Sequence, residues 1–142
     1  ADAAMAGGAK TLGVIPTHLL SREAPEGRDT QRIITETMHE RKSRIEKLSD
    51  GVIALPGGYG TLDELFEMLT WGQLGLHSKP VGILNIKGFF DPLLETVDHI
   101  VAEGFLRADH QNQLVVSCDI HALLEGMADY QPPTVEKWIG LE

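Results

Sequence analysis

A strand, a glycine-rich loop and a helix follow one another directly between Gly51 and Leu74. The run from Gly51 to Leu55 is continuously apolar, which is typical of a strand buried on both faces of a parallel sheet. The residues from Pro56 to Gly60 form a turn-rich loop, and a helical pattern begins at Thr61. A buried strand that leads through a short loop into a helix is the building unit of α/β proteins.

The same alternation continues along the chain. Further strands are predicted at residues 11–15, 32–35, 80–84 and 114–117, and further helices at residues 38–48, 91–103 and 120–128. In the helix from Thr61 to Leu74, we expect Leu62, Leu65, Phe66 and Leu69 to face the core, with Glu64, Glu67 and Trp71 on another face. Parallel pairing with right-handed crossovers then gives a three-layer, Rossmann-like α/β fold, an open parallel sheet with helices on both faces.

Length and composition restrict the classes of protein. The 142 residues suit a single domain, residues 1–142, and no interdomain linker is visible. A net charge of −9 argues against a nucleic-acid partner. The single Cys118 and the scattered histidines predict no disulfide and no metal site. No apolar run reaches the roughly 18 residues of a membrane span, so we expect a cytoplasmic protein without a membrane partner.

The glycine loop is a candidate anion site. In a parallel sheet, ligands bind at the carboxyl ends of the strands, where this loop lies. Glycine permits positive φ and lets a ligand approach the backbone, so that the amides of Gly58, Gly60 and Thr61 can face a phosphate at the helix N-terminus. The loop lacks the Walker and dinucleotide patterns, and a simple tight turn remains an alternative.

Two charged residues have both a structural and a functional interpretation. Thr61 and Glu64 fit a Thr-x-x-Glu capping box, whereas a ligand-facing Glu64 in the first helical turn would orient a hydroxyl or a water. Arg41 lies within an apolar helical stripe, so it must form a salt bridge or reach a polar cavity. Its neighbour Lys42 is either solvated or in contact with a phosphate.

These motifs together resemble the LOG ("Lonely Guy") family of cytokinin riboside 5′-monophosphate phosphoribohydrolases, which are often mislabelled lysine decarboxylases. The residues from Pro56 to Glu64 match its signature Pro-Gly-Gly-x-Gly-Thr-x-x-Glu, and those from Met38 to Lys42 match a second motif. The stretch from Thr70 to Gly82 is also similar, and the likeness extends to about Gly126.

The resemblance implies hydrolysis of the N-glycosidic bond of N6-substituted adenosine 5′-monophosphates, which releases the free base and ribose 5-phosphate without a cofactor. Arg41 and Glu64 would be catalytic: Glu64 would stabilise the positive charge left on the ribose, and Arg41 would keep Glu64 ionised and orient the substrate. The substrate and phosphate site would consist of Met38, Lys42, Gly57, Gly58, Tyr59, Gly60 and Thr61.

The resemblance also implies a homodimer, with Trp71, Leu74 and Leu76 as interface residues. Family members have a strand, a helix and a first glycine-rich loop upstream of the stretch that begins here at Ala1, so we expect further residues before it. A protein of the same fold that binds a nucleotide or phosphorylated cofactor without turnover is the alternative. A lysine decarboxylase would need a pyridoxal-binding lysine and a much larger chain.

Overall fold

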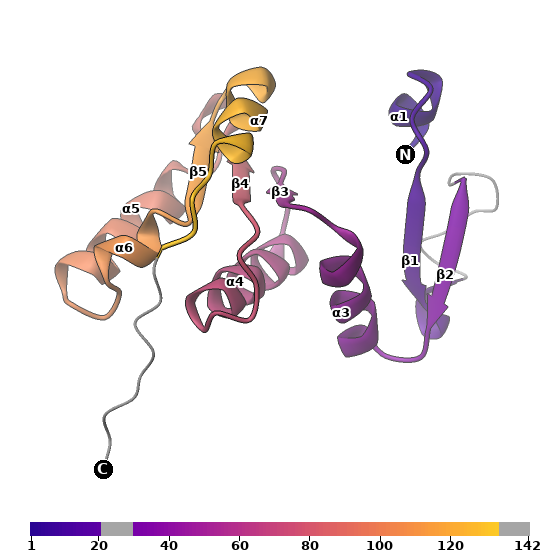
Figure 1. The fold of residues 1–142 in the computed structure, drawn as a ribbon, viewed down its shortest axis with the longest axis horizontal. Helices are drawn as coiled ribbons and strands as arrows, with labels where there is room; N and C mark the ends of the chain where they lie inside the picture. Colours follow the sequence, from indigo (N-terminus) through magenta and orange to yellow (C-terminus); the bar gives the residue numbers. More distant parts are fainter. Residues whose placement is uncertain (21–29, 134–142) are drawn as a thin grey trace, which may run out of the picture. The chain divides into compact units, whose positions relative to one another are not determined.

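The computed structural model of the chain describes residues 1–20 and 30–133 (Figure 1). The predicted polar loop through Pro25 and Gly27 lies outside these residues. The chain divides into two compact units, Ala1–Ser49 and Asp50–Glu142, and each has its own parallel sheet. The assignment of residues 1–142 to one domain stays a prediction.

In the described residues of the first unit, two parallel strands are accompanied by three helical elements. Its elements in chain order are α1 (Asp2–Ala6), β1 (Leu12–Pro16), the 3-10 turn η1 (Thr17–Leu19), β2 (Gln31–Thr35) and α3 (Met38–Leu48). Leu12 pairs with Gln31 and Pro16 with Thr35. Branched apolar residues favour the strands, and both predicted strands and the predicted helix at 38–48 are confirmed.

Two hydrogen bonds between side chains and backbone amides fix the start of α3. The Thr37 hydroxyl accepts a hydrogen bond from the Glu40 amide at 3.1 Å, and the Glu40 carboxylate accepts one from the Glu36 amide at 2.9 Å. The first bond caps α3 through its N-cap residue, and the second ties Glu40 to the residue before the N-cap rather than to the N-cap amide of a standard capping box.

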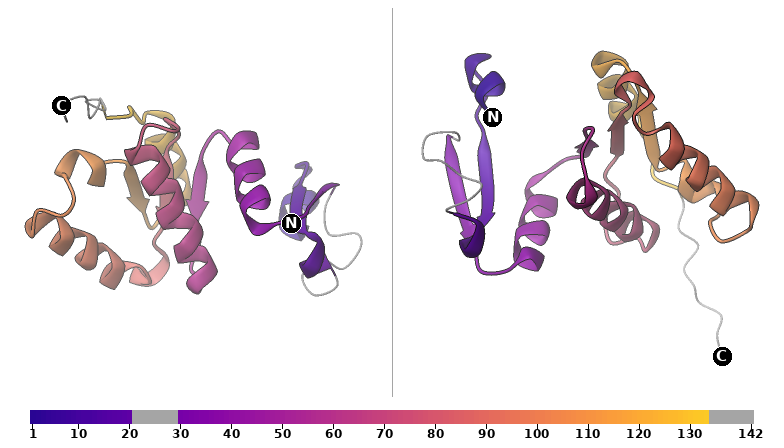
Figure 2. Two further views of the ribbon diagram at one scale, coloured as in Figure 1. Left: turned by 90° about the horizontal axis from the view of Figure 1, so that it is seen from below. Right: turned by 180° about the vertical axis from the view of Figure 1, so that it is seen from behind.

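Over residues 50–133, the second unit has three parallel strands in the order β3-β4-β5, which lie side by side in Figure 1 and in both views of Figure 2. Val81 of the central strand pairs with Val52 on one side and with Leu114 on the other. The elements are β3 (Val52–Ala54), α4 (Tyr59–Gln73), β4 (Val81–Leu84), the 3-10 turn η2 (Ile86–Gly88), α5 (Asp91–Ala102), α6 (Ala108–Gln111), β5 (Leu114–Ser117) and α7 (Ile120–Ala128).

Both faces of this sheet are covered by helices. Val81 and Ile83 belong to a buried apolar cluster with Leu65 and Met68 of α4 and with Phe90. Gly82 points to the opposite face of the pleat, where α7 packs so closely that an added Cβ would lie 2.6 Å from the Met127 sulfur. Helix, sheet and helix form three layers, and the predicted Rossmann-like α/β fold class is confirmed.

Several details of α4 differ from the prediction. Met68 is 6% exposed and belongs to the core, whereas Phe66 is 41% exposed. Trp71 packs, half-buried, against the core cluster instead of lying away from it. The sequence pattern assigned Leu65 to the core correctly, but it also assigned Phe66 to the core. The pattern within one helix does not show which side chains at the edge of its apolar face the neighbouring elements cover.

The turn α6 was not predicted, since its four residues, Ala108 to Gln111, contain too few apolar positions to show a helical period. Within the described parts of the chain, no helix combines the length and the apolar character that a membrane span requires.

Candidate functional site

The glycine-rich loop leads from the carboxyl end of β3 into α4. Gly58 is the N-cap of α4, in an extended conformation with φ −99° and ψ −153°, and no side chain caps the helix there. The first helical hydrogen bond runs from the Leu62 amide to the Gly58 carbonyl. The amides of Gly58, Tyr59, Gly60 and Thr61 therefore have no partner carbonyl within α4 and form the positive end of its dipole.

The space beside this backbone is open. A Cβ added at Gly58 or at Gly60 would meet no protein atom within 4 Å. At Gly57, in contrast, an added Cβ would overlap the Thr61 hydroxyl. Positive φ is not the reason for these glycines, because none of the three adopts it. The prediction that they need that freedom is wrong, and close access to the backbone is the property that they retain.

The predicted capping box at Thr61 and Glu64 is also wrong. Since α4 begins at Tyr59, Thr61 already lies within the helix, and Glu64 lies in its second turn rather than its first. Glu64 is half-buried, between the core-facing Leu65 and the exposed Asp63. Its carboxylate therefore does not cap the start of α4.

Arg41 lies in α3 of the first unit and is half-buried. Its Nε–H donates a hydrogen bond to the Val14 carbonyl of β1 at 3.1 Å. We expected Arg41 to form a salt bridge or to reach a polar cavity. The structure gives it a hydrogen bond to a backbone carbonyl of the adjacent strand. Met38 and Lys42 of the same helix are also half-buried, whereas His39 and Arg44 are exposed.

The loop between β4 and α5 lies at the same edge of the second sheet as the glycine loop, because β3 and β4 are parallel neighbours. The Asn85 side chain holds it: its carbonyl oxygen accepts the Phe90 amide at 2.8 Å and its amide donates to Asp91 at 2.7 Å. Lys87 has a positive φ of 53°, which is uncommon for a side-chain-bearing residue. Sequence reasoning missed this loop, although an asparagine directly after a strand is a turn signal.

His77 has a structural contact rather than a ligand role. Its Nδ1 accepts the Lys79 amide at 3.1 Å, and its Nε2 lies 2.9 Å from the Met68 carbonyl oxygen of α4. Among the residues that the structure describes, no cluster of three or more His, Cys, Asp or Glu side chains is arranged to hold a metal ion.

The site residues therefore form two groups, each described within its own unit. Gly57, Gly58, Tyr59, Gly60, Thr61 and Glu64 lie around the start of α4 in the second unit, and Met38, Arg41 and Lys42 lie on α3 in the first.

The chain is similar to a family of proteins described as "Possible lysine decarboxylase", whose pattern matches residues 1–127. It belongs to this family. Its curated relatives are named for a different chemistry. A probable cytokinin riboside 5′-monophosphate phosphoribohydrolase of Oryza sativa subsp. japonica, LOGL1, is 47% identical over 130 residues, which are 92% of this chain and 58% of the relative.

Two further relatives are named for the same activity. The phosphoribohydrolase LOG2 of Arabidopsis thaliana is 44% identical over 89% of this chain and 59% of its own length. The phosphoribohydrolase LOG of Oryza sativa subsp. japonica is 43% identical over 89% of this chain and 52% of its own length. These names confirm the resemblance to LOG proteins, and the chain spans little more than half the length of the relatives it matches.

Proposed function

We propose that this protein hydrolyses the N-glycosidic bond of N6-substituted adenosine 5′-monophosphates. Water adds its hydroxyl to the anomeric carbon, the bond from that carbon to the purine nitrogen breaks, and the free cytokinin or adenine base leaves with a proton beside ribose 5-phosphate. The observation that carries this proposal is the 47% identity, over 92% of the chain, to a probable phosphoribohydrolase of that substrate class.

The glycine loop is proposed to hold the 5′-phosphate. The amides of Gly58, Gly60 and Thr61 lie at the positive end of α4, where an anion is favoured. The open space beside Gly58 and Gly60 supports close approach of a phosphate to the backbone. Gly57 and Tyr59 complete this loop, and Tyr59, which is 93% exposed, has its side chain available to a substrate.

Glu64 is proposed as a catalytic residue. Departure of the purine leaves positive charge on the ribose, and a carboxylate near the anomeric carbon stabilises that charge and positions water. Glu64 follows Thr61 by three residues in α4, a rise of about 4.5 Å along the helix axis from the last amide proposed for the phosphate.

Arg41 is proposed as the second catalytic residue, with Met38 and Lys42 as substrate contacts. This proposal rests on the match of the stretch from Met38 to Lys42 to the second LOG motif. The Nε–H of Arg41 donates to the Val14 carbonyl, and a guanidinium is well suited to orient an anionic substrate because its planar set of N–H donors matches the oxygens of a phosphate.

We further propose a homodimer, a cytoplasmic location and a reaction without a cofactor. Leu74 and Leu76 are 63% and 68% exposed at the end of α4, which supports their place in an interface. Trp71 contributes less to that interface than the sequence suggested, since it packs against the core of its own unit.

Base release tests the proposed activity. The full protein is incubated with isopentenyladenosine monophosphate or AMP, and the free base is measured by chromatography. Glu64→Gln and Arg41→Ala are each expected to lower kcat by on the order of 10²–10⁴-fold, as the loss of a catalytic group does. Glu67→Gln and Arg44→Ala on the same helices are the matched controls and should retain activity.

The same variants separate the enzyme from a binding protein. If calorimetry shows tight AMP binding while the wild-type protein releases no base, the protein is a nucleotide-binding member of the family. If the Glu64 and Arg41 variants release base at the wild-type rate, their assignment as catalytic residues is wrong even though the activity stands.

A further inference from the structure

A small cavity lies in the second unit between the second half of α4, α5, α6 and the start of β5. It has a volume of about 170 Å³. Its apolar lining consists of Phe66, Leu69, Val97, Ile100, Leu106 and Leu114. Since an apolar cavity of roughly 150 Å³ holds a benzene molecule, this one has room for a single aromatic ring with one small substituent.

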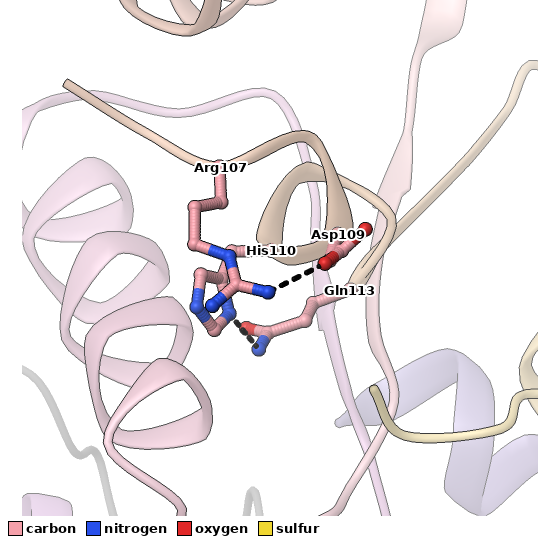
Figure 3. Close-up of polar contacts among 4 residues, drawn as sticks. All are labelled: Arg107, Asp109, His110 and Gln113. Carbon is pink, nitrogen blue, oxygen red and sulfur yellow. Dashed lines mark hydrogen bonds and ion pairs between the residues drawn. The ribbon is translucent and has the colours of Figure 1, made fainter. Parts of the chain in front are cut away.

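Polar side chains also line the cavity, and three of them belong to α6 or to the chain just after it. These are His110, Gln111 and Gln113. The Gln113 amide nitrogen and the His110 Nδ1 are 3.3 Å apart, and Figure 3 shows the two side chains directed toward one another. The Gln111 side-chain amide donates a hydrogen bond to Asp98. Because amide and neutral imidazole groups both donate and accept hydrogen bonds, they suit a ligand group that does the same.

Gln113 is the buried member of this polar set. It is 4% exposed, and burial of an amide is costly unless its hydrogen bonds are made. Among the described residues, the His110 ring is the one hydrogen-bond partner of its side chain, and their separation of 3.3 Å slightly exceeds the usual range of about 2.7–3.2 Å. Its carbonyl oxygen lies so close to α4 that a Cβ added at Gly72 would be 3.1 Å from it. The amide is therefore held between α4 and α6, and its chemistry allows further hydrogen bonds.

The lining that the structure describes contains no Lys, Arg, Asp or Glu side chain. Arg107 and Asp109 belong to the same turn as His110, but their side chains form an ion pair with each other at 2.9 Å and are more than half exposed (Figure 3). Because transfer of an unpaired charge into an apolar cavity is costly, a phosphate, carboxylate or ammonium group is disfavoured there. The lining therefore selects a neutral ligand.

We propose that this cavity binds a neutral aromatic molecule of one ring with a hydroxyl group, which is the phenol class. The ring lies among the apolar side chains, and the hydroxyl exchanges hydrogen bonds with the polar groups of His110 and Gln113. A bound ring contacts α4, α5 and α6 together and stabilises their packing. The site is independent of the proposed hydrolysis, because it shares no residue with the glycine loop, Glu64 or Arg41.

Phenol, toluene and benzoate test the ligand class in the full chain, because they share the aromatic ring and differ in one substituent. Binding is followed by NMR titration of the isotope-labelled protein, with the amide signals of residues 110–113 as reporters. Phenol is expected to shift these signals saturably and to bind at least about 10-fold more tightly than benzoate, whose charge has no partner in the lining. Absence of saturable shifts with phenol at millimolar concentrations, or benzoate binding as tight as that of phenol, would overturn the proposal.

The Gln113→Leu variant separates the polar contact from the apolar ones. Leucine keeps an apolar side chain in the lining but removes the amide, so the affinity for phenol should fall about 3- to 10-fold, as the loss of one neutral hydrogen bond does. The affinity for toluene should stay the same or rise. Gln131→Leu, at an exposed glutamine outside the lining, is the control and should change neither affinity. Equal losses for phenol and toluene in Gln113→Leu would mean that the amide does not contact the hydroxyl, and the phenol class would be wrong.

A matched pair of threonine variants tests the location, and it serves if Gln113→Leu does not fold. Thr70 and Thr96 are both exposed, and each hydroxyl donates to the carbonyl four residues earlier, but only Thr70 lines the cavity. Thr70→Phe is expected to place its ring in the cavity and abolish saturable binding of phenol and toluene, whereas Thr96→Phe should leave both affinities unchanged. If phenol bound to both variants as it does to the wild type, the ligand would lie elsewhere and the proposed site would be wrong.

Discussion

The junction between β2 and α3 and the junction between β3 and α4 are built in opposite ways. Between β2 and α3, the Thr37 hydroxyl and the Glu40 carboxylate accept hydrogen bonds from backbone amides of the junction. Between β3 and α4, the N-cap is Gly58, which has no side chain to offer. Side chains at the start of α3 accept hydrogen bonds from backbone amides. At the start of α4 no side chain does so, and the amides face the space beside the loop.

This difference shows how an anion site is distinguished from an ordinary helix start. Both helices have a positive N-terminal dipole and unpaired amides, so neither property alone marks a ligand site. The open space next to Gly58 and Gly60 is the additional feature at α4. The last helix, α7, resembles α3, since its N-cap Asp119 accepts a hydrogen bond from the Ala122 amide at 2.9 Å.

The Gly58→Ala variant is expected to give the largest effect among the tests of this difference between the starts of α3 and α4. The backbone at Gly58 is extended with negative φ and an added Cβ would meet no protein atom, so the free energy of unfolding should fall by no more than about 1 kcal/mol, the difference between glycine and alanine at an N-cap. The Cβ would, however, displace a phosphate from the amides. Because a hydrogen bond to a charged group contributes about 1.5–3 kcal/mol, AMP affinity measured by calorimetry should fall about 10- to 100-fold.

Gly104→Ala is the matched control for this variant. Gly104 has a φ of 80° at the end of α5, so alanine there is strained, and the variant should lose about 1 kcal/mol of stability and no AMP affinity. A Gly58→Ala protein that binds AMP as tightly as the wild type would show that the phosphate does not lie at this helix start.

A pair of threonine variants compares the junctions directly. Thr37→Ala removes a side-chain cap and is expected to lower the free energy of unfolding by about 1 kcal/mol. Thr61→Ala changes a residue inside α4, where alanine is favoured, and removes the hydroxyl that lies against Gly57 of the glycine loop. It should therefore lower AMP affinity without a comparable loss of stability. Urea unfolding followed by circular dichroism and AMP calorimetry measure the two effects. If both variants lowered the free energy of unfolding equally, the proposed difference between a capped start of α3 and an uncapped start of α4 would be wrong.

The strands and most helices could be predicted because their signals are local. The predicted helices at 38–48 and 120–128 and the strand at 114–117 have the observed bounds, since apolar runs and polar caps lie within the same few residues. The first residue of α4 could not be predicted from such local signals. Thr61 and Glu64 fit the capping pattern as well as Thr37 and Glu40 do, and only the extended backbone of Gly58 shows which pattern begins a helix.

The sequence identified the residues of the candidate site, but it did not predict which groups they contact. The apolar stripe of α3 indicated that Arg41 needs a partner, but the Val14 carbonyl lies 27 residues earlier and enters through the pairing of α3 with β1. Likewise, sequence spacing placed Glu64 close to the glycine loop. The conclusion that it does not cap the helix depended on where α4 begins.

The smallest expected effect on the free energy of unfolding comes from removing a charge at the junction between β2 and α3. Glu40→Gln keeps an oxygen that can accept the Glu36 amide but removes the negative charge from the first turn of α3. The loss of the favourable interaction with the helix dipole is expected to lower the free energy of unfolding by about 0.3–1 kcal/mol at low ionic strength. In about 1 M NaCl, where the screening length is roughly 3 Å, most of this difference should disappear.

Urea midpoints of the wild type and the variant at both salt concentrations measure this effect, with the exposed Glu95→Gln in the middle of α5 as the control that should be neutral. A loss that persists in high salt would mean that the geometry of the hydrogen bond to Glu36, rather than charge, determines the contribution of Glu40. The two junctions would then differ in hydrogen bonding alone, and the dipole of α4 would be a weaker argument for a phosphate beside Gly58 than the open space at that glycine.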